Sequence, residues 1–316
     1  MDPNLEYWQN NGKTFLSRLR IWLNILDPSS ILSSDVEINN ARSLIRRDGN
    51  QLKDEKVINA WKLSLCSVHA DTGEPISTVL RPQAFLPVSA PFVIASLMPH
   101  KGVTPALFWQ LLLHGYCAGF NYANRNATAT PENKLSTKQS LLITGTVAYS
   151  TFAGALPQII IKRLAVSSSS AQAFCRSVLP VPLSACLAAF SVFVVRSEES
   201  ENGIKVFDSS GNPVGVSREA GYKAVKETAI SRATLFGTTA LVPNLMVLLL
   251  KRGKLAKMNP VMFAPVRHMS TAIVLGLMIP VSFSLFPQLG KIKKENVEKE
   301  LQILTGDVEL YYHRGL

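Results

Sequence analysis

The chain has 316 residues, 47% of them hydrophobic and only 17% charged, whereas soluble domains usually carry about 25% charged residues. Its net charge of +11 comes from Lys and Arg that flank long apolar runs instead of clustering among aromatic side chains. This distribution argues against nucleic acid as a partner and for a membrane surface with its lipids. The four cysteines form no C-x-x-C pair and have no His at metal-ligand spacing, so no metal site is predicted.

The first 81 residues form a polar region in which short helices are expected. Apolar residues at helical spacing share one face of the first helix, namely Phe15, Leu19, Trp22 and Leu26. Such a face suits either a membrane surface or packing on the rest of the protein. Two further helices are predicted over residues 35–47 and 52–65, with Asp35 and Asp54 as N-caps.

Residues 82–290 are predicted to form a transmembrane domain. Six runs of at least eighteen residues contain no Lys, Arg, Asp or Glu: 82–100, 102–124, 139–161, 177–195, 233–250 and 268–290. A membrane-spanning helix needs roughly 20 such residues. The first run holds four prolines, which kink or break helices, so a broken or partly inserted segment is expected there. The fold class is therefore an all-α membrane protein with about five transmembrane helices.

Two segments outside the membrane are expected to connect or end the spans. Residues 196–232 form a long loop, in which 203–208 alternates like a strand and Gly211-Asn212-Pro213 supplies a turn. A small β-hairpin is the simplest interpretation. The tail, 291–316, is predicted to carry a short amphipathic helix with Ile292, Val297, Leu301 and Leu304 on its apolar face.

No catalytic set stands out in the sequence. Glycine-rich phosphate loops and the H-E-x-x-H and G-x-S-x-G motifs are absent, so neither an enzyme activity nor a cofactor is expected. Three titratable groups fall within the six residues His69, Ala70, Asp71, Thr72, Gly73 and Glu74. A turn is the favoured interpretation, with Gly73 at positive φ. A binding site is the alternative, and these acids with His69 form the one local cluster that could hold iron.

Polar residues in or beside the spans are candidates for a substrate path. They are Asn121, Tyr122, Asn124, Arg125, Thr144 and Asn244. Proline-interrupted helices bind small polar solutes in many transporters, and the charged ends of a zwitterionic amino acid suit half-helix termini. Ordinary interhelical packing is the alternative for each residue. Three arginines flank uncharged runs and are expected to reach the membrane surface, with substrate binding as the alternative: Arg176, Arg232 and Arg267.

These segments together resemble the sideroflexin family over nearly the whole chain, from Leu26-Asp27-Pro28 to Tyr312-His313-Arg314-Gly315-Leu316. The family hallmark H-P-D-T-G-E stands here as residues 69–74, with Ala70 in place of proline. Further matching segments are PALFWQ at 105–110, NYANR at 121–125, GNPVG at 211–215, Ser231-Arg232 and LFPQ at 285–288. No single segment is specific, but the set is.

The resemblance implies a multi-pass protein of the inner mitochondrial membrane. Better-understood family members carry serine and related small amino acids, and the family is tied to iron, haem and iron–sulfur homeostasis. One branch is associated with assembly of respiratory complex I, so a membrane scaffold that binds complex I assembly proteins is the alternative function. Because Ala70 leaves φ unrestrained where proline would fix it, the resemblance implies transport of small amino acids more than of serine itself.

Overall fold

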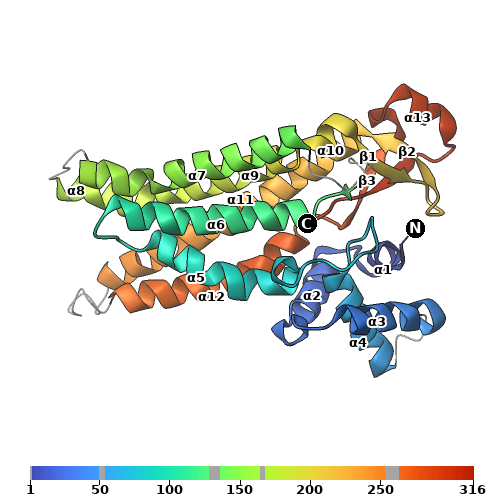
Figure 1. Ribbon diagram of the computed structural model, residues 1–316, viewed down its shortest axis with the longest axis horizontal. Helices are drawn as coiled ribbons and strands as arrows, with labels where there is room; N and C mark the ends of the chain where they lie inside the picture. Colours follow the sequence, from blue (N-terminus) through green and yellow to red (C-terminus); the bar gives the residue numbers. More distant parts are fainter. Residues whose placement is uncertain (1, 50–53, 128–135, 164–167, 253–262) are drawn as a thin grey trace.

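The computed structural model describes residues 2–49, 54–127, 136–163, 168–252 and 263–316. Long helices run side by side along its longest axis, and a second layer covers one end of this bundle (Figure 1). The covering layer consists of the N-terminal helices and a small β-sheet, and both chain termini lie there. Segments far apart in the sequence are therefore brought together at one end of the bundle.

The N-terminal region is helical, as predicted. Its elements are α1 (Pro3–Asn11), α2 (Phe15–Ile25), η1 (Pro28–Ser30), α3 (Asp35–Asp48), α4 (Glu55–Ser67) and η2 (Thr78–Leu80). Asp54 caps α4 as predicted, because its carboxylate accepts from the Lys56 amide at 2.9 Å. The predicted cap of α3 was wrong by one residue. Ser34 is the N-cap there, in a reciprocal capping box with Glu37, which satisfies two orphan donors at once.

Helix α2 packs on the protein through a face different from the predicted one. Its buried residues are Arg18, Ile21, Trp22 and Ile25, so only Trp22 of the predicted apolar set is buried. The Trp22 ring lies edge-on to Phe283, with 5.1 Å between centroids. Arg18 donates through Nε to the Ser284 carbonyl at 2.9 Å. These contacts fix α2 to the end of a bundle helix, which favours the packing interpretation.

Six longer helices build the bundle. They are α5 (Phe85–Leu97), α6 (Val103–Ala123), α7 (Thr137–Arg163), α9 (Pro180–Val195), α11 (Arg218–Arg252) and α12 (Phe263–Ser284). Three described segments are long and apolar enough to cross a membrane: Ser169–Val195, Arg218–Leu250 and Ala264–Ser284. The first of these joins α8 (Ser169–Ala173) and the π-helical turn η5 (Phe174–Val178) to α9. Helices α6 and α7 have 21 and 27 residues, enough for about 30 Å each, but they are less apolar.

The proline-rich run forms a helix shorter than a span. After the 3₁₀ turn η3 (Pro82–Ala84), α5 has 13 residues, which rise only about 20 Å. It contains Pro91 and ends just before Pro99. Proline cannot donate to the helical ladder and disfavours helix at the residue before it, so this run yields a short apolar helix packed on α6 and α12.

A four-stranded antiparallel sheet corrects the all-α prediction. Its strands are β1 (Ile204–Phe207), β2 (Pro213–Ser217), β3 (Leu289–Lys293) and β4 (Glu309–His313), in the order β2-β1-β4-β3. The predicted hairpin is confirmed as β1 and β2, with Gly211 at φ +84° in the turn. The tail supplies the other two strands. Ile292, predicted in a tail helix, lies in β3, and only the short α13 (Lys299–Leu304) and the 3₁₀ turn η8 (Lys294–Asn296) are helical there.

The segment 196–232, predicted as one loop, is mostly regular structure. It contains α10 (Ser197–Asn202), the hairpin and about four turns of α11, which begins at Arg218. One face of the sheet packs on the first turns of α11 through Val206, Ala220, Ala224 and Tyr312. Helix α11 therefore runs without interruption from the sheet into the bundle, and it ties the two layers together.

Candidate functional site

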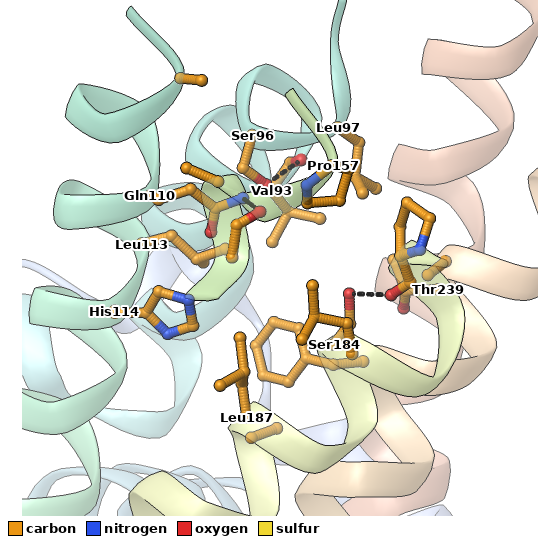
Figure 2. A pocket seen from close by; sticks show the side chains of 18 of the residues that line it. Val93, Ser96, Leu97, Gln110, Leu113, His114, Pro157, Ser184, Leu187 and Thr239 are labelled. Carbon is orange, nitrogen blue, oxygen red and sulfur yellow. Dashed lines mark hydrogen bonds between the residues drawn. The ribbon is translucent and has the colours of Figure 1, made fainter. Parts of the chain in front are cut away.

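A cavity of about 240 Å³ lies inside the helical bundle. Side chains from α5, α6, α7, α9 and α11 surround it (Figure 2). Those drawn facing it include Val93, Gln110, His114, Pro157, Ser184 and Thr239. Ligand pockets for drug-sized molecules measure about 300–1,000 Å³, so this cavity suits a smaller solute.

The two ends of the cavity differ in exposure. At one end its lining includes Met98, Pro99 and Arg176, which are exposed. At the other end the lining includes Asn121 and Arg232, which are only 3% and 2% exposed. The cavity is thus accessible from the end of the bundle opposite to the sheet and closed toward the sheet (Figure 1).

The middle of the cavity is lined by polar side chains that donate hydrogen bonds to backbone carbonyls. The Gln110 amide donates to the Gly154 carbonyl at 3.2 Å and so links α6 to α7. The Ser184 hydroxyl donates to the Pro180 carbonyl at 2.6 Å, and Thr239 to the Leu235 carbonyl at 2.7 Å. Each hydroxyl oxygen keeps lone pairs that can accept from a solute. No Asp or Glu is among the described lining residues.

Arg232 is the charged group at the closed end. Its Nε lies 3.4 Å from Oδ1 of Asn121, and its Nη2 is buried with no hydrogen-bond partner among the described residues. The guanidinium carbon lies 4.6 Å from the centroid of the Phe283 ring, 5.4 Å from that of Phe120 and 5.7 Å from that of Phe85. Three aromatic faces therefore hold a cation that has no partner carboxylate among the described residues.

These three rings pack against one another at the closed end of the cavity, where Phe85 belongs to its lining. Phe85 and Phe120 are 4.5 Å apart between centroids, and Phe120 stacks on Phe283 at 6.4 Å with an interplanar angle of 18°. All three are at most 1% exposed. They come from α5, α6 and α12, and Trp22 of α2 covers Phe283 from outside. The ring cluster therefore fills the space between the closed end of the cavity and α2.

Of the predicted path residues, only Asn121 lines the cavity. Asn124 caps α6 through its side-chain amide, which donates to the Leu80 and Phe120 carbonyls, both at 2.9 Å. Arg125 lies over the Tyr122 ring at 3.7 Å. These residues hold the end of α6 in the covering layer, so the structure separates them from Asn121.

The remaining two predicted path residues lie on other helices. Thr144 is exposed on α7 and is not part of the cavity lining. Asn244 donates to the Ser177 and Ala240 carbonyls at 3.0 and 2.8 Å and so joins α11 to η5. The second bond reaches the residue four positions earlier on the same helix, close to the interruption at Pro243.

The three arginines expected at the membrane surface all line the cavity. Arg176 and Arg267 lie at its exposed end, where the second donates to the carbonyl of the first at 3.4 Å. Arg232 does not reach the surface, because α11 extends fourteen residues before it and α6 and α12 pack around it. In the sequence, Arg232 directly precedes the uncharged run 233–250, so that pattern predicts a residue at the end of a helix. The helical pattern that continues before it could have shown that it lies inside a longer helix.

The family motif forms a closed turn in the covering layer. The His69 amide donates to the Glu74 carbonyl at 2.9 Å, and Gly73, at φ +72°, donates to the His69 carbonyl at 2.8 Å. The predicted turn is therefore confirmed. Nδ1 of His69 accepts from the Asp71 and Thr72 amides at 3.2 and 3.3 Å. Its proton is thus on Nε2, which donates to the Arg125 carbonyl at 2.6 Å.

Two of the titratable side chains of this turn, His69 and Asp71, are largely buried and interact with each other, whereas Glu74 is exposed. Burial alone would raise the pKa of the Asp71 carboxyl, but His313, His69 and the Ala127 amide outweigh it and lower the pKa to about 2. Burial lowers the pKa of His69, against the opposing charge of Asp71. At neutral pH the turn therefore holds an ionised Asp71 and a neutral His69.

The motif is joined to the sheet and to α10 by a buried polar network. Asn126 follows α6, and its amide donates to Glu199 at 2.7 Å and to the His313 carbonyl at 3.0 Å. Glu199 receives two bonds from the Arg196 guanidinium, at 2.5 and 2.8 Å, and both side chains are fully buried. No three His, Cys, Asp or Glu side chains among the described residues come together in a way that could hold a metal ion.

Comparison with known proteins finds matches to one family over the full length of the chain. The family model for sideroflexins matches residues 2–316. Sideroflexin-4 of Danio rerio is 65% identical over 317 residues, covering 100% of both chains. Sideroflexin-4 of Homo sapiens is 36% identical over 100% of this chain and 93% of its own length. Sideroflexin-5 of Homo sapiens is 29% identical over 96% of this chain and 90% of its own. No solved structure matches the chain.

Proposed function

The chain belongs to the sideroflexin family, and from that premise we propose that it carries small amino acids across the inner mitochondrial membrane. Five spans would form the carrier: α6, α7, α9, α11 and α12. The cavity is the single observation that carries the proposal. It lies within the bundle, is lined mainly by apolar side chains with polar groups such as those of Gln110, Ser184 and Thr239 among them, and is accessible from one end, as expected for a transporter in one of its two access states.

The closed end suggests what must move in a transport cycle. Phe85 at the closed end of the cavity packs on Phe120 and Phe283, and the three rings belong to three different helices. Helix α5 has 13 residues, against 21 in α6 and 22 in α12, and carries Pro91 in its interior, so fewer backbone hydrogen bonds hold it in place. A displacement of α5 would open the ring cluster while α6 and α12 stay packed.

Uptake into proteoliposomes tests the proposal. Purified full-length protein is reconstituted and offered each of the twenty labelled amino acids. We expect saturable uptake of small ones, and at least a tenfold loss in Asn121→Leu, since a buried polar contact of the cavity is removed. Thr144→Leu, which lies outside the lining, should transport normally. Absence of uptake for all twenty amino acids would refute the proposal.

One observation favours the scaffold as a second candidate. Three apolar side chains in and just after α13 are largely exposed: Ile303 at 85%, Leu304 at 68% and Val308 at 78%. They lie outside the helical bundle, and exposed apolar clusters are typical of interaction surfaces. A photo-crosslinker placed at Ile303 in mitochondria should capture a complex I subunit or assembly protein if the chain is a scaffold. Recovery of the uncrosslinked protein alone would count against it.

A further inference from the structure

Arg232 is a buried cation at the edge of the cavity, and it lacks a partner of opposite charge among the described residues. It lies in the stretch of α11 that is apolar enough to cross a membrane, is 2% exposed, and borders the cavity. Its Nη2 is buried with no hydrogen-bond partner among the described residues. Its Nε makes one long bond, 3.4 Å, to a neutral amide. An ionisable side chain at membrane depth is by default a functional group whose partner must be named.

The surroundings of Arg232 stabilise a cation only in part. The ring faces of Phe283, Phe120 and Phe85 lie within 5.7 Å of the guanidinium carbon. A desolvated cation is stabilised by an aromatic face, but burying an ion without a partner costs more than such a contact returns. The described lining of the cavity contains no Asp or Glu that could make up the difference.

A carboxylate is the ligand that completes this environment. The guanidinium is planar and pairs bidentately with a carboxylate, which supplies both the missing charge and the missing acceptor. We infer that Arg232 is the carboxylate anchor of the cavity and that the cavity selects its solute by the carboxylate, not by the ammonium group. This inference rests on the proposed transport of small amino acids and adds the residue and the group that determine specificity.

The rest of the cavity lining also favours the carboxylate of a solute over its ammonium group. An ammonium group would meet only neutral oxygen acceptors, such as those of Gln110, Ser184 and Thr239. Such hydrogen bonds orient a solute but provide no counter-charge. Arg176 and Arg267 at the accessible end add positive potential, which attracts anions and repels amines before they enter.

Two fragments of serine separate the contribution of the carboxylate to binding from that of the ammonium group. 3-Hydroxypropionate is serine without its amino group, and ethanolamine is serine without its carboxylate. Binding is measured on the full-length protein in detergent, as the rise in melting temperature with ligand concentration. We expect serine and 3-hydroxypropionate to stabilise the protein with similar affinity. Ethanolamine should bind at least about 30-fold more weakly, because a buried charge pair is lost.

Substitutions at Arg232 distinguish an anchor from a structural residue. Arg232→Met should abolish binding of both carboxylates, while the melting temperature of the ligand-free protein stays equal or rises, since an unpaired buried charge is removed. A structural arginine would show the opposite, a lower melting temperature without ligand. Arg232→Lys keeps the positive charge but loses the planar guanidinium with its paired donors, and should weaken the binding of 3-hydroxypropionate by about tenfold. Arg163→Met removes one charge outside the lining and serves as the control.

The outcomes separate this inference from the proposed function. Binding of 3-hydroxypropionate that depends on Arg232, without uptake into proteoliposomes, would keep the anchor and refute the carrier. Uptake that is unchanged in Arg232→Met would keep the carrier and refute the anchor. The anchor is also refuted if ethanolamine stabilises the protein as well as serine does, or if neither carboxylate binds.

Discussion

The side-chain amide of Asn126 lies 2.7 Å from the carboxylate of Glu199, across 73 residues of sequence. Asn126 follows the end of α6, and Glu199 lies in α10, at the edge of the sheet. Both are at most 1% exposed. This contact, with the Arg196 guanidinium behind it, joins the transmembrane bundle to the covering layer through groups that must all be satisfied once they are buried.

Removing the charge of Glu199 should therefore destabilise the whole protein. In Glu199→Gln, the Arg196 guanidinium loses its counter-ion while both side chains stay buried, which typically costs about 3–5 kcal/mol. Thermal unfolding in detergent measures the effect. Glu201→Gln is the matched control, because its pair with Lys138 is half exposed and should contribute about 0–1 kcal/mol. Equal melting temperatures for the two variants would contradict the assigned network.

The contact between α10 and α11 leaves no room for a methyl group at Gly221. A Cβ there would overlap the backbone carbonyl of Glu199, so α10 would have to shift away from α11. Gly221→Ala should destabilise by about 1–3 kcal/mol. In Gly115→Ala, by contrast, nothing lies within 4 Å of the new methyl, and better helix propensity should add up to about 1 kcal/mol. Opposite shifts in melting temperature are therefore expected, and shifts of the same sign would argue against the packing.

The buried His69 should make the protein sensitive to mild acid. Its pKa is lowered in the folded state, so below about pH 6.5 the unfolded chain takes up a proton that the folded chain does not. Stability due to this group is complete above pH 6.5 and declines as the pH falls toward the lowered value. Between pH 7.5 and 5.5, the melting temperature of His69→Gln should fall less steeply than that of the parent. Parallel curves would show that His69 titrates alike in both states.

Local chemistry in the sequence predicted the local structure. The uncharged runs predicted the apolar helices, Asp54 the start of α4, and Gly211 the turn between β1 and β2. Each depends on residues a few positions apart. Strand β4 could not be predicted in this way, because its partners in β1 lie more than a hundred residues earlier, and a short segment with alternating side chains pairs only where tertiary structure places an open edge.

The candidate site was harder to predict, because a cavity depends on how helices face one another. Of the predicted path, Asn121 lines the cavity, whereas Asn124 and Thr144 do not. Polarity alone did not distinguish them, since an asparagine at a helix end can cap the helix and a threonine can donate to the carbonyl four residues earlier on its own helix. Arg232 was assigned to the membrane surface by its position next to an uncharged run. Its burial follows from the length of α11 and the rings around it.

Narrowing the cavity distinguishes a carrier from a scaffold. A Cβ on Gly154 would lie 3.2 Å from Nε2 of His114 and closer still to the Gln110 amide, so Gly154→Val pushes a larger side chain between α6 and α7 at the cavity wall. Gly145→Val places the same side chain on the same helix in open space. If the cavity is the transport path, uptake into proteoliposomes should fall at least tenfold in the first variant only, with melting temperatures that differ little. A scaffold whose cavity has no role would retain its partners in both variants, and uptake that is equal in the two would exclude this cavity as the path.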